Sequence, residues 1–258
     1  EMRIPLLLLL ALSSIEPGAS QIEAYTLDKP CGGCQFHVDE VGVLRKVEDS
    51  QNCVLLSCSG TLDFARAYIT SVAEGTFDGL SLVTGLSLEG NGLTELPFSL
   101  LWQMDSLKVL RLSDNRIAAL TSEAFRGNGA LEEIYLQRNA LASLPEGIFG
   151  SNPSLKKAYL SGNRLTAVPA SLFAANPLIT ELGLDDNQIG GVDAQAFGAL
   201  SALEKLYISG NRLASVPDLS SSPKLRRLTL FGNLIGDVPP GSFGANPLLD
   251  ELYVVESQ

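Results

Sequence analysis

The sequence of 258 residues predicts an α/β solenoid, in which similar coils of chain stack side by side and share one parallel β-sheet. Three observations predict it. Asparagine recurs at a nearly constant interval, the same apolar spacing surrounds each asparagine, and a second apolar column follows ten residues later. Because each coil can bury its apolar side only against its neighbours, we expect residues 59–258 to fold as one array, with about eight repeats and a truncated last one.

The asparagine column marks the repeat. Its interval is 24 residues five times and then 22, and its members are Asn91, Asn115, Asn139, Asn163, Asn187, Asn211 and Asn233. One copy of the apolar frame runs Leu107-x2-Leu110-x-Leu112-x2-Asn115, and a degenerate copy with Ala67 at the asparagine position precedes the column. An asparagine amide has two donors and an acceptor, so we expect a structural ladder that bridges the backbone of adjacent coils.

The Leu-x-Leu alternation within the frame predicts a short strand in every coil, with one face buried. Strands that return every 24 residues in the same direction lie parallel, which gives roughly nine strands in one sheet. The return half of each coil should contain few regular helices. It carries an apolar column that we expect to stack behind the sheet, formed by Phe77, Leu101, Phe125, Phe149, Phe173, Phe197 and Phe243. This half is bulkier than the strand, so the array should curve with the sheet on its concave side.

Residues 1–20 have the pattern of a secretory signal peptide. Arg3 gives a positive start, residues 4–12 are apolar, and small or polar residues precede Gln21. The apolar run is shorter than the roughly 20 residues that span a bilayer. The alternative is a buried helix or strand, which the position of the run beside Met2 and before Pro17 disfavours.

The four cysteines lie within 28 residues of each other, as Cys31, Cys34, Cys53 and Cys58. In an exported chain such a set predicts two disulfides, with three possible connectivities. A zinc site is the alternative, because Cys31 and Cys34 have ligand spacing. We therefore expect residues 21–58 to form a disulfide-bonded N-terminal cap. No comparable cover is visible at the other end, so we expect either a fragment or a last coil that is exposed or paired.

The frame Leu-x2-Leu-x-Leu-x2-Asn-x-Leu-x2-Leu-Pro-x4-Phe resembles the typical leucine-rich repeats of extracellular proteins. These include Toll-like receptors, small proteoglycans, Slit-type proteins and lamprey variable lymphocyte receptors. The resemblance covers about three quarters of the chain. It implies a horseshoe with a parallel concave sheet and a cysteine-closed N-terminal cap. The cap departs from that pattern, because it has no Cys-x-Cys pair and 18 residues separate Cys34 from Cys53. Phe-x2-Asn, as at Phe125 and Asn128, replaces the more usual Phe-x2-Leu.

Function is expected on the side chains that the frame leaves free on the concave face. One column contains four of the six tyrosines and runs Ser87, Arg111, Tyr135, Tyr159, Gly183, Tyr207, Thr229 and Tyr253. A neighbouring column runs Glu89, Ser113, Gln137, Ser161, Asp185, Ser209 and Phe231. Exposed tyrosine suits protein interfaces, although tyrosine also packs well on a sheet without any partner. The predicted ligand contacts are Arg111, Tyr135, Tyr159, Tyr207, Phe231 and Tyr253.

Charged residues beside the tyrosines nearly alternate in sign along a column formed by Glu133, Lys157, Glu181, Lys205, Arg227 and Glu251. A parallel column contains Glu132, Lys156, Glu204 and Arg226. Opposite charges on neighbouring strands stabilise a sheet modestly, so we expect a structural role for these columns.

Catalysis and cofactor binding are not expected. His37 is the only histidine and lies in the cap region, and no phosphate-binding glycine loop or zinc-type histidine pair is present. We expect no metal site. Asp185 and Asp186 are unsuited to calcium because adjacent residues on a strand point to opposite sides. The net charge of −11 and the pI near 4.6 argue against a nucleic-acid partner.

The sequence therefore predicts a secreted or cell-surface module that binds a protein or peptide ligand. The alternative is the N-terminal ectodomain fragment of a larger transmembrane signalling receptor, which would meet the membrane only through a segment beyond Gln258. An intracellular scaffold is a third hypothesis, which the signal pattern and the clustered cysteines oppose.

Overall fold

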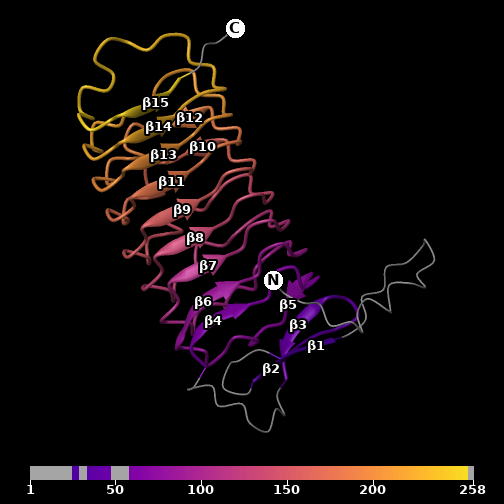
Figure 1. Cartoon of the computed structure of the whole chain (residues 1–258). Helices are drawn as coiled ribbons and strands as arrows, with labels where there is room; N and C mark the ends of the chain where they lie inside the picture. The colour runs from indigo at the N-terminus through magenta and orange to yellow at the C-terminus, as the bar shows by residue number, and fades with distance from the viewer. Residues whose placement is uncertain (1–24, 29–33, 48–57, 255–258) are drawn as a thin grey trace, which may run out of the picture.

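The predicted solenoid is present in the computed structural model, which describes residues 25–28, 34–47 and 58–254. Every regular element of that part of the chain is a β-strand, and the strands form three sheets. Figure 1 shows the coils stacked in chain order, with the strands of the largest sheet along one face and the return segments opposite. The predicted signal peptide at 1–20 lies outside the described residues.

The largest sheet has nine strands, as the repeat predicts, and all of them are parallel. They are β4 (Gly60–Asp63), β6 (Val83–Ser87), β7 (Val109–Arg111), β8 (Glu133–Tyr135), β9 (Lys157–Tyr159), β11 (Glu181–Gly183), β13 (Lys205–Tyr207), β14 (Arg227–Thr229) and β15 (Glu251–Tyr253). Successive strands pair at equivalent repeat positions, so that Leu110 faces Ile134 and Ile134 faces Ala158. Equivalent residues of successive coils therefore form straight columns across the sheet.

The core lies between the sheet and the return segments. The central residue of each inner strand is buried, and the phenylalanines behind the sheet form the predicted spine. The ring centroids of Phe125 and Phe149 are 5.9 Å apart, and those of Phe149 and Phe173 are 5.8 Å apart. Their planes differ by only 3° and 4°. The return segments consist mainly of turns, such as the one in which Asn152 N–H donates to Phe149 O. The same bond between residues three positions apart recurs in neighbouring coils, as from Asn128 N–H to Phe125 O and from Asn176 N–H to Phe173 O. These bonds form turns.

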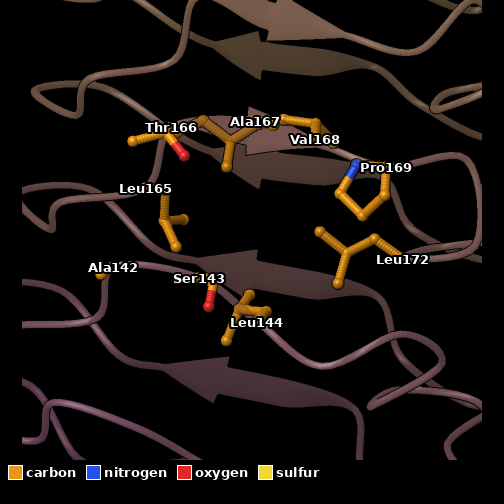
Figure 2. Close-up of a pocket in the computed structure, with 10 residues that line it drawn as sticks. Ala142, Ser143, Leu144, Leu165, Thr166, Ala167, Val168, Pro169 and Leu172 are labelled. Atoms are coloured by element: carbon orange, nitrogen blue, oxygen red, sulfur yellow. The ribbon is translucent and has the colours of Figure 1, made fainter.

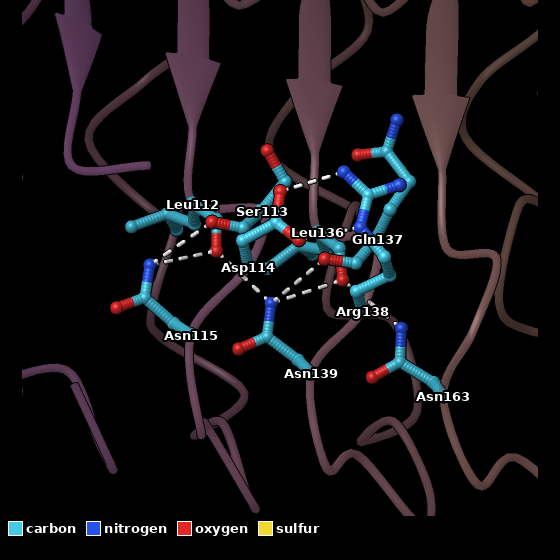
Figure 3. Close-up of polar contacts among 9 residues, drawn as sticks. All are labelled: Leu112, Ser113, Asp114, Asn115, Leu136, Gln137, Arg138, Asn139 and Asn163. Carbon is cyan, nitrogen blue, oxygen red and sulfur yellow. Dashed lines mark hydrogen bonds and ion pairs between the residues drawn. The ribbon is translucent and has the colours of Figure 1, made fainter. Parts of the chain in front are cut away.

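The asparagine column bridges adjacent coils at the ends of the strands (Figure 3). The Oδ1 atom of Asn139 accepts a hydrogen bond from Ile117 N–H at 3.0 Å. Its Nδ2 atom donates to Leu112 O at 2.9 Å and to Leu136 O at 3.1 Å. The other members of the column repeat these bonds, because each occupies the same place in its coil. The backbone groups that leave the sheet thus find partners without water.

A second asparagine ladder lies on the return side, and sequence reasoning did not assign it a role. It explains the Phe-x2-Asn spacing, and its members are Asn128, Asn152, Asn176 and Asn246. The Nδ2 atom of Asn152 donates to Phe125 O at 3.0 Å and to Asn128 O at 2.8 Å in the preceding coil. All four side chains are buried, and their Oδ1 atoms have no hydrogen-bond partner among the described residues.

The N-terminal part adds a small sheet to the first coil. It comprises β1 (Tyr25–Asp28), β2 (Gln35–Val38), β3 (Val43–Lys46) and β5 (Ser71–Val72), and β5 belongs to the repeat array. The buried Phe36 ring contacts Phe64 at 5.0 Å and Phe77 at 6.3 Å, so it covers the open end of the first coil.

Two of the four cysteines, Cys34 and Cys58, are described, and both are buried and disulfide-bonded. Cys31 and Cys53 lie outside the described residues, so the connectivity and the cap boundary at residue 58 stay predictions.

The last strand is less covered than the inner ones. Leu252 of β15 occupies the frame position that is buried in every preceding strand of the sheet, but its side chain is 43% exposed. Leu248 and Tyr253 are exposed as well. Within the described residues, no further coil packs against this end of the array.

Candidate ligand-binding face

The register places the predicted contact residues in one column on the exposed face of the large sheet. Arg111, Tyr135 and Tyr159 are direct neighbours across β7, β8 and β9. Tyr207 and Tyr253 occupy the equivalent positions of β13 and β15. Each of these residues ends its strand, so its side chain points to the opposite face from the apolar residue before it. The spacing of the repeat alone positions this column.

Arg111, Tyr135 and Tyr159 form a continuous stack. The Arg111 guanidinium carbon lies 4.2 Å from the centroid of the Tyr135 ring, which is a cation–π distance. The Tyr135 and Tyr159 rings are 5.0 Å apart and inclined by 22°. The Tyr135 hydroxyl donates to Glu133 Oε2 at 2.6 Å. Stacking and hydrogen bonding together hold these rings in one orientation.

Burial raises the pKa of Tyr135, and the hydrogen bond to the Glu133 carboxylate adds to this effect. Burial also raises the pKa of Tyr159, again with a contribution from a hydrogen bond, here to Glu181. Both phenols therefore remain protonated at neutral pH, with their O–H groups committed to carboxylates. What the rings offer to a ligand is their apolar faces and the lone pairs of their oxygens.

The far half of the column is organised around Arg227. This side chain donates to Tyr207 Oη at 3.5 Å and to Glu251 Oε1 at 2.7 Å, and the Tyr253 hydroxyl donates to Glu251 at 3.4 Å. Phe231 follows β14 and is 49% exposed.

The charged column beside the tyrosines forms the expected cross-strand pairs. Lys157 Nζ lies 2.8 Å from Glu133 Oε1, and Lys205 Nζ lies 3.3 Å from Glu181 Oε2. Exposed pairs of this kind contribute at most about 1 kcal/mol each to stability. Their structural consequence is that the cations of this column are already paired, and that the carboxylates are held where the tyrosine hydroxyls reach them.

Gly183 interrupts the tyrosine column between Tyr159 and Tyr207. A Cβ atom at this glycine would lie 3.0 Å from Tyr159 Cδ1 and 3.1 Å from Ser161 Oγ, so the ring and the hydroxyl lean over the space that a side chain would fill. The column is thus divided into two groups, one around the Tyr135–Tyr159 stack and one around Arg227.

Asp185, two residues after Gly183, has an environment that sequence reasoning did not identify. Its Oδ1 atom accepts hydrogen bonds from Ser209 N–H at 2.8 Å and from Thr229 Oγ1–H at 3.4 Å. Burial raises the pKa of the Asp185 carboxyl, and the negative charge of Asp186 raises it further. The glycine in the tyrosine column and the serines of the adjacent coils were the available sequence signals, but they do not show how deeply the carboxylate is buried.

A small apolar pocket of about 150 Å³ lies elsewhere, on the return side between two coils (Figure 2). Leu144, Val168 and Leu172 line it, and its rim includes Thr166 and Ala167. It opens beside β10 (Ala167–Val168), which pairs only with β12 (Gly191–Val192) in the coil on its other side. The pocket is a gap between coils and holds none of the predicted contact residues.

The described residues contain no group of three or more histidine, cysteine or acidic side chains that could hold a metal ion. Within the same ranges, none of the elements is a helix with the length and apolar character needed to cross a bilayer.

Comparison with known proteins supports the interpretation of the repeat. A family model of the leucine-rich repeat matches residues 105–165 and 153–213, and a model of two such repeats matches residues 201–243. Together the matches extend over slightly more than half of the chain. No curated protein matches the chain.

Among solved structures, a leucine-rich-repeat protein of Leptospira interrogans is 26% identical with a TM-score of 0.68, over 77% of this chain and 49% of that one. TLR13 in its complex with ssRNA13 is 23% identical with a TM-score of 0.71, over 80% of this chain and 30% of that one. Internalin C2 from Listeria monocytogenes is 21% identical with a TM-score of 0.65, over 81% and 87%. This chain thus spans about half of the Leptospira protein and less than a third of TLR13. Given the repeat, the parallel sheet and these matches, the chain belongs to the leucine-rich-repeat proteins.

Proposed function

We propose that this protein binds a protein or peptide ligand on the exposed face of its nine-stranded sheet. Solenoids of stacked repeats generally use such extended surfaces for binding other proteins. The observation that carries the proposal is the ordered aromatic column, in which Tyr135 and Tyr159 stack 5.0 Å apart and carboxylates hold their hydroxyls. Side chains that are already ordered lose little conformational entropy when a ligand binds.

The charge distribution favours a protein over a nucleic acid as the ligand. The chain carries a net charge of −11, and Lys157, Lys205 and Arg227 on this face are each paired with a glutamate. A nucleic-acid phosphate backbone would need unpaired cations. The RNA in the TLR13 complex is a property of that protein, and the 23% identity extends only the fold to this chain.

We also propose that the protein acts outside the cell, either secreted or on the outer face of the plasma membrane. The support is the signal-peptide pattern of residues 1–20 and the clustered cysteines, of which Cys34 and Cys58 are disulfide-bonded. Disulfides persist mainly in oxidising compartments. Detection of the tagged protein in the culture medium of transfected cells, without residues 1–20, tests this proposal. Retention of the uncleaved chain in the cytosol would contradict it.

The test of ligand binding uses a library of random displayed peptides selected on the immobilised full chain. Selected peptides are then measured by calorimetry against a variant with Tyr135→Ser, Tyr159→Ser, Tyr207→Ser and Phe231→Ala. Loss of an interface hot spot costs about 2 kcal/mol or more, so we expect affinity to fall by at least about 30-fold.

The matched control carries Tyr68→Ser and Phe98→Ala, two aromatic residues outside the sheet that are 68% and 55% exposed. This control should bind as the unmodified protein does. Equal binding by the fourfold variant, or a library without any peptide that depends on the sheet face, would refute the proposed site.

A further inference from the structure

Asp185 is a partly buried carboxylate on the sheet face that forms no ion pair among the described residues. Glu133, Glu181 and Glu251 are each paired with a lysine or arginine of an adjacent strand. Among the described residues, Asp185 forms no ion pair, and its partners are the Ser209 N–H and the Thr229 hydroxyl. A partly buried carboxylate without a counter-charge is energetically costly, and perturbed titratable groups of this kind cluster at functional sites.

A buried hydroxyl without a hydrogen-bond partner in the described part of the chain lies beside Asp185. Ser209 is only 2% exposed, and its Oγ atom has no hydrogen-bond partner among the described residues. Its backbone N–H is bonded to Asp185, so the hydroxyl and the carboxylate lie in the same locus. Gly183 contributes no side chain at the position where the two adjacent coils place Tyr159 and Tyr207, so the carboxylate has no bulky neighbour before it on its own coil.

The same face already shows how a guanidinium is held. Arg111 lies over the Tyr135 ring at 4.2 Å within the tyrosine column. Tyr159 and Tyr207 flank the Asp185 coil on either side, since β11 lies between β9 and β13. A planar group with several N–H donors can lie on an aromatic ring and bond a carboxylate at the same time.

We propose that Asp185 binds an arginine side chain of the protein or peptide ligand, between the side chains of Tyr159 and Tyr207. This inference rests on the proposed function and specifies the chemistry of its central contact. It gives the ligand a positive charge that complements the acidic chain, and it distinguishes this locus from the paired charges on either side of it.

The experiment uses the peptides selected on the full chain. Binding is measured for the unmodified protein, for Asp185→Asn and for Asp186→Asn, and each selected peptide is also made with its arginines replaced by citrulline. Asparagine keeps an acceptor for Ser209 N–H and Thr229, so Asp185→Asn should remain folded, which a thermal melt verifies. Asp186→Asn removes the same net charge from an exposed neighbouring side chain and is the matched control.

We expect the selected peptides to be rich in arginine, and Asp185→Asn to weaken their binding by about 10- to 100-fold, as for a charge-assisted hydrogen bond. Asp186→Asn should change binding by less than about 3-fold. Citrulline should weaken binding to the unmodified protein but cause little further loss with Asp185→Asn, because the two changes remove the same contact.

Three results would overturn the inference. If peptides lose affinity for the fourfold aromatic variant but not for Asp185→Asn, the arginine site is refuted and the proposed function stands. If Asp185→Asn and Asp186→Asn lower peptide affinity equally, the effect comes from the net charge of the protein and not from a site at Asp185. If neither the aromatic variant nor Asp185→Asn changes peptide affinity, both proposals are refuted.

Discussion

Replacement of Asn139 by leucine tests whether the asparagine ladder holds the coils in register. Leucine has nearly the same size and shape but no polar atoms, so the change removes hydrogen bonds with little change in packing. The bonds lost are those from Ile117 N–H and to Leu112 O, Leu136 O and Gln137 O. The size of the effect depends on which of these groups keep another partner.

Three of these four backbone groups keep another hydrogen-bond partner after the substitution, and one does not. Leu112 O also accepts from Asn115, Leu136 O also accepts from Asn163, and Gln137 O also accepts from Asp114 N–H. Ile117 N–H has no second acceptor among the described residues. An unsatisfied donor costs about 1–3 kcal/mol, and the three weakened carbonyls add about 1 kcal/mol together. We therefore expect the free energy of unfolding to fall by about 2–4 kcal/mol.

Urea unfolding measures this loss, with far-ultraviolet circular dichroism for the whole array and tryptophan fluorescence for one coil. Trp102 is the only tryptophan and lies two coils before that of Asn139, in the coil that precedes Asn115. With an m value of about 3 kcal/mol per molar urea, the midpoint should fall by about 1 M. Arg116→Leu is the control, since this exposed side chain follows Asn115 and should change stability by less than about 0.5 kcal/mol. An Asn139→Leu midpoint equal to that of the control would refute the reasoning.

Two further predictions concern a close approach and a buried charge. Gly127→Ala should lower the free energy of unfolding by about 1–3 kcal/mol, because the new Cβ would lie 2.8 Å from Trp102 Cα and closer still to its carbonyl oxygen. Gly129→Ala, whose Cβ would meet only Ser151 O at 3.9 Å, should be nearly neutral in the same urea titration. Asp185→Asn should raise the melting temperature at pH 7. Burial raises the pKa of this carboxyl in the folded state, so the fold favours its protonated form. The stability from this preference is fully present below the unfolded pKa of about 3.9, and it is lost as the pH rises through the folded-state pKa. The gain should therefore shrink as the melt is repeated toward pH 3, and a gain independent of pH would contradict the assignment.

The columns of this protein were predictable from the sequence, because residues that are one repeat apart occupy the same place in successive coils. Parallel strands that return every 24 residues must place equivalent residues side by side, so the spacing alone assigns Tyr135 and Tyr159 to one column. The same argument predicted the bonds of Asn139 and the stacking of Phe149 on its neighbours, since each has an equivalent in the adjacent coil.

Departures from the repeat were less predictable. The role of Asn152 on the return side depends on how closely two turns approach, and the pairing of β3 with β5 depends on how the cap meets the first coil. The pairing of β3 with β5 has no periodic signal at all. The Phe-x2-Asn spacing was visible in the sequence, but its bonds to carbonyls of the preceding coil were not.

The sequence by itself determined the repeat, the parallel sheet, the buried frame and the column in which each exposed side chain lies. Only the tertiary structure decided which charges on that face neutralise each other and which do not. The reason is that periodicity specifies neighbours, whereas burial and pairing depend on distances of a few ångströms between side chains that can turn in several directions. Glu181 reaches Lys205 and becomes part of the scaffold, while Asp185, four residues further along the chain, has no cation within reach.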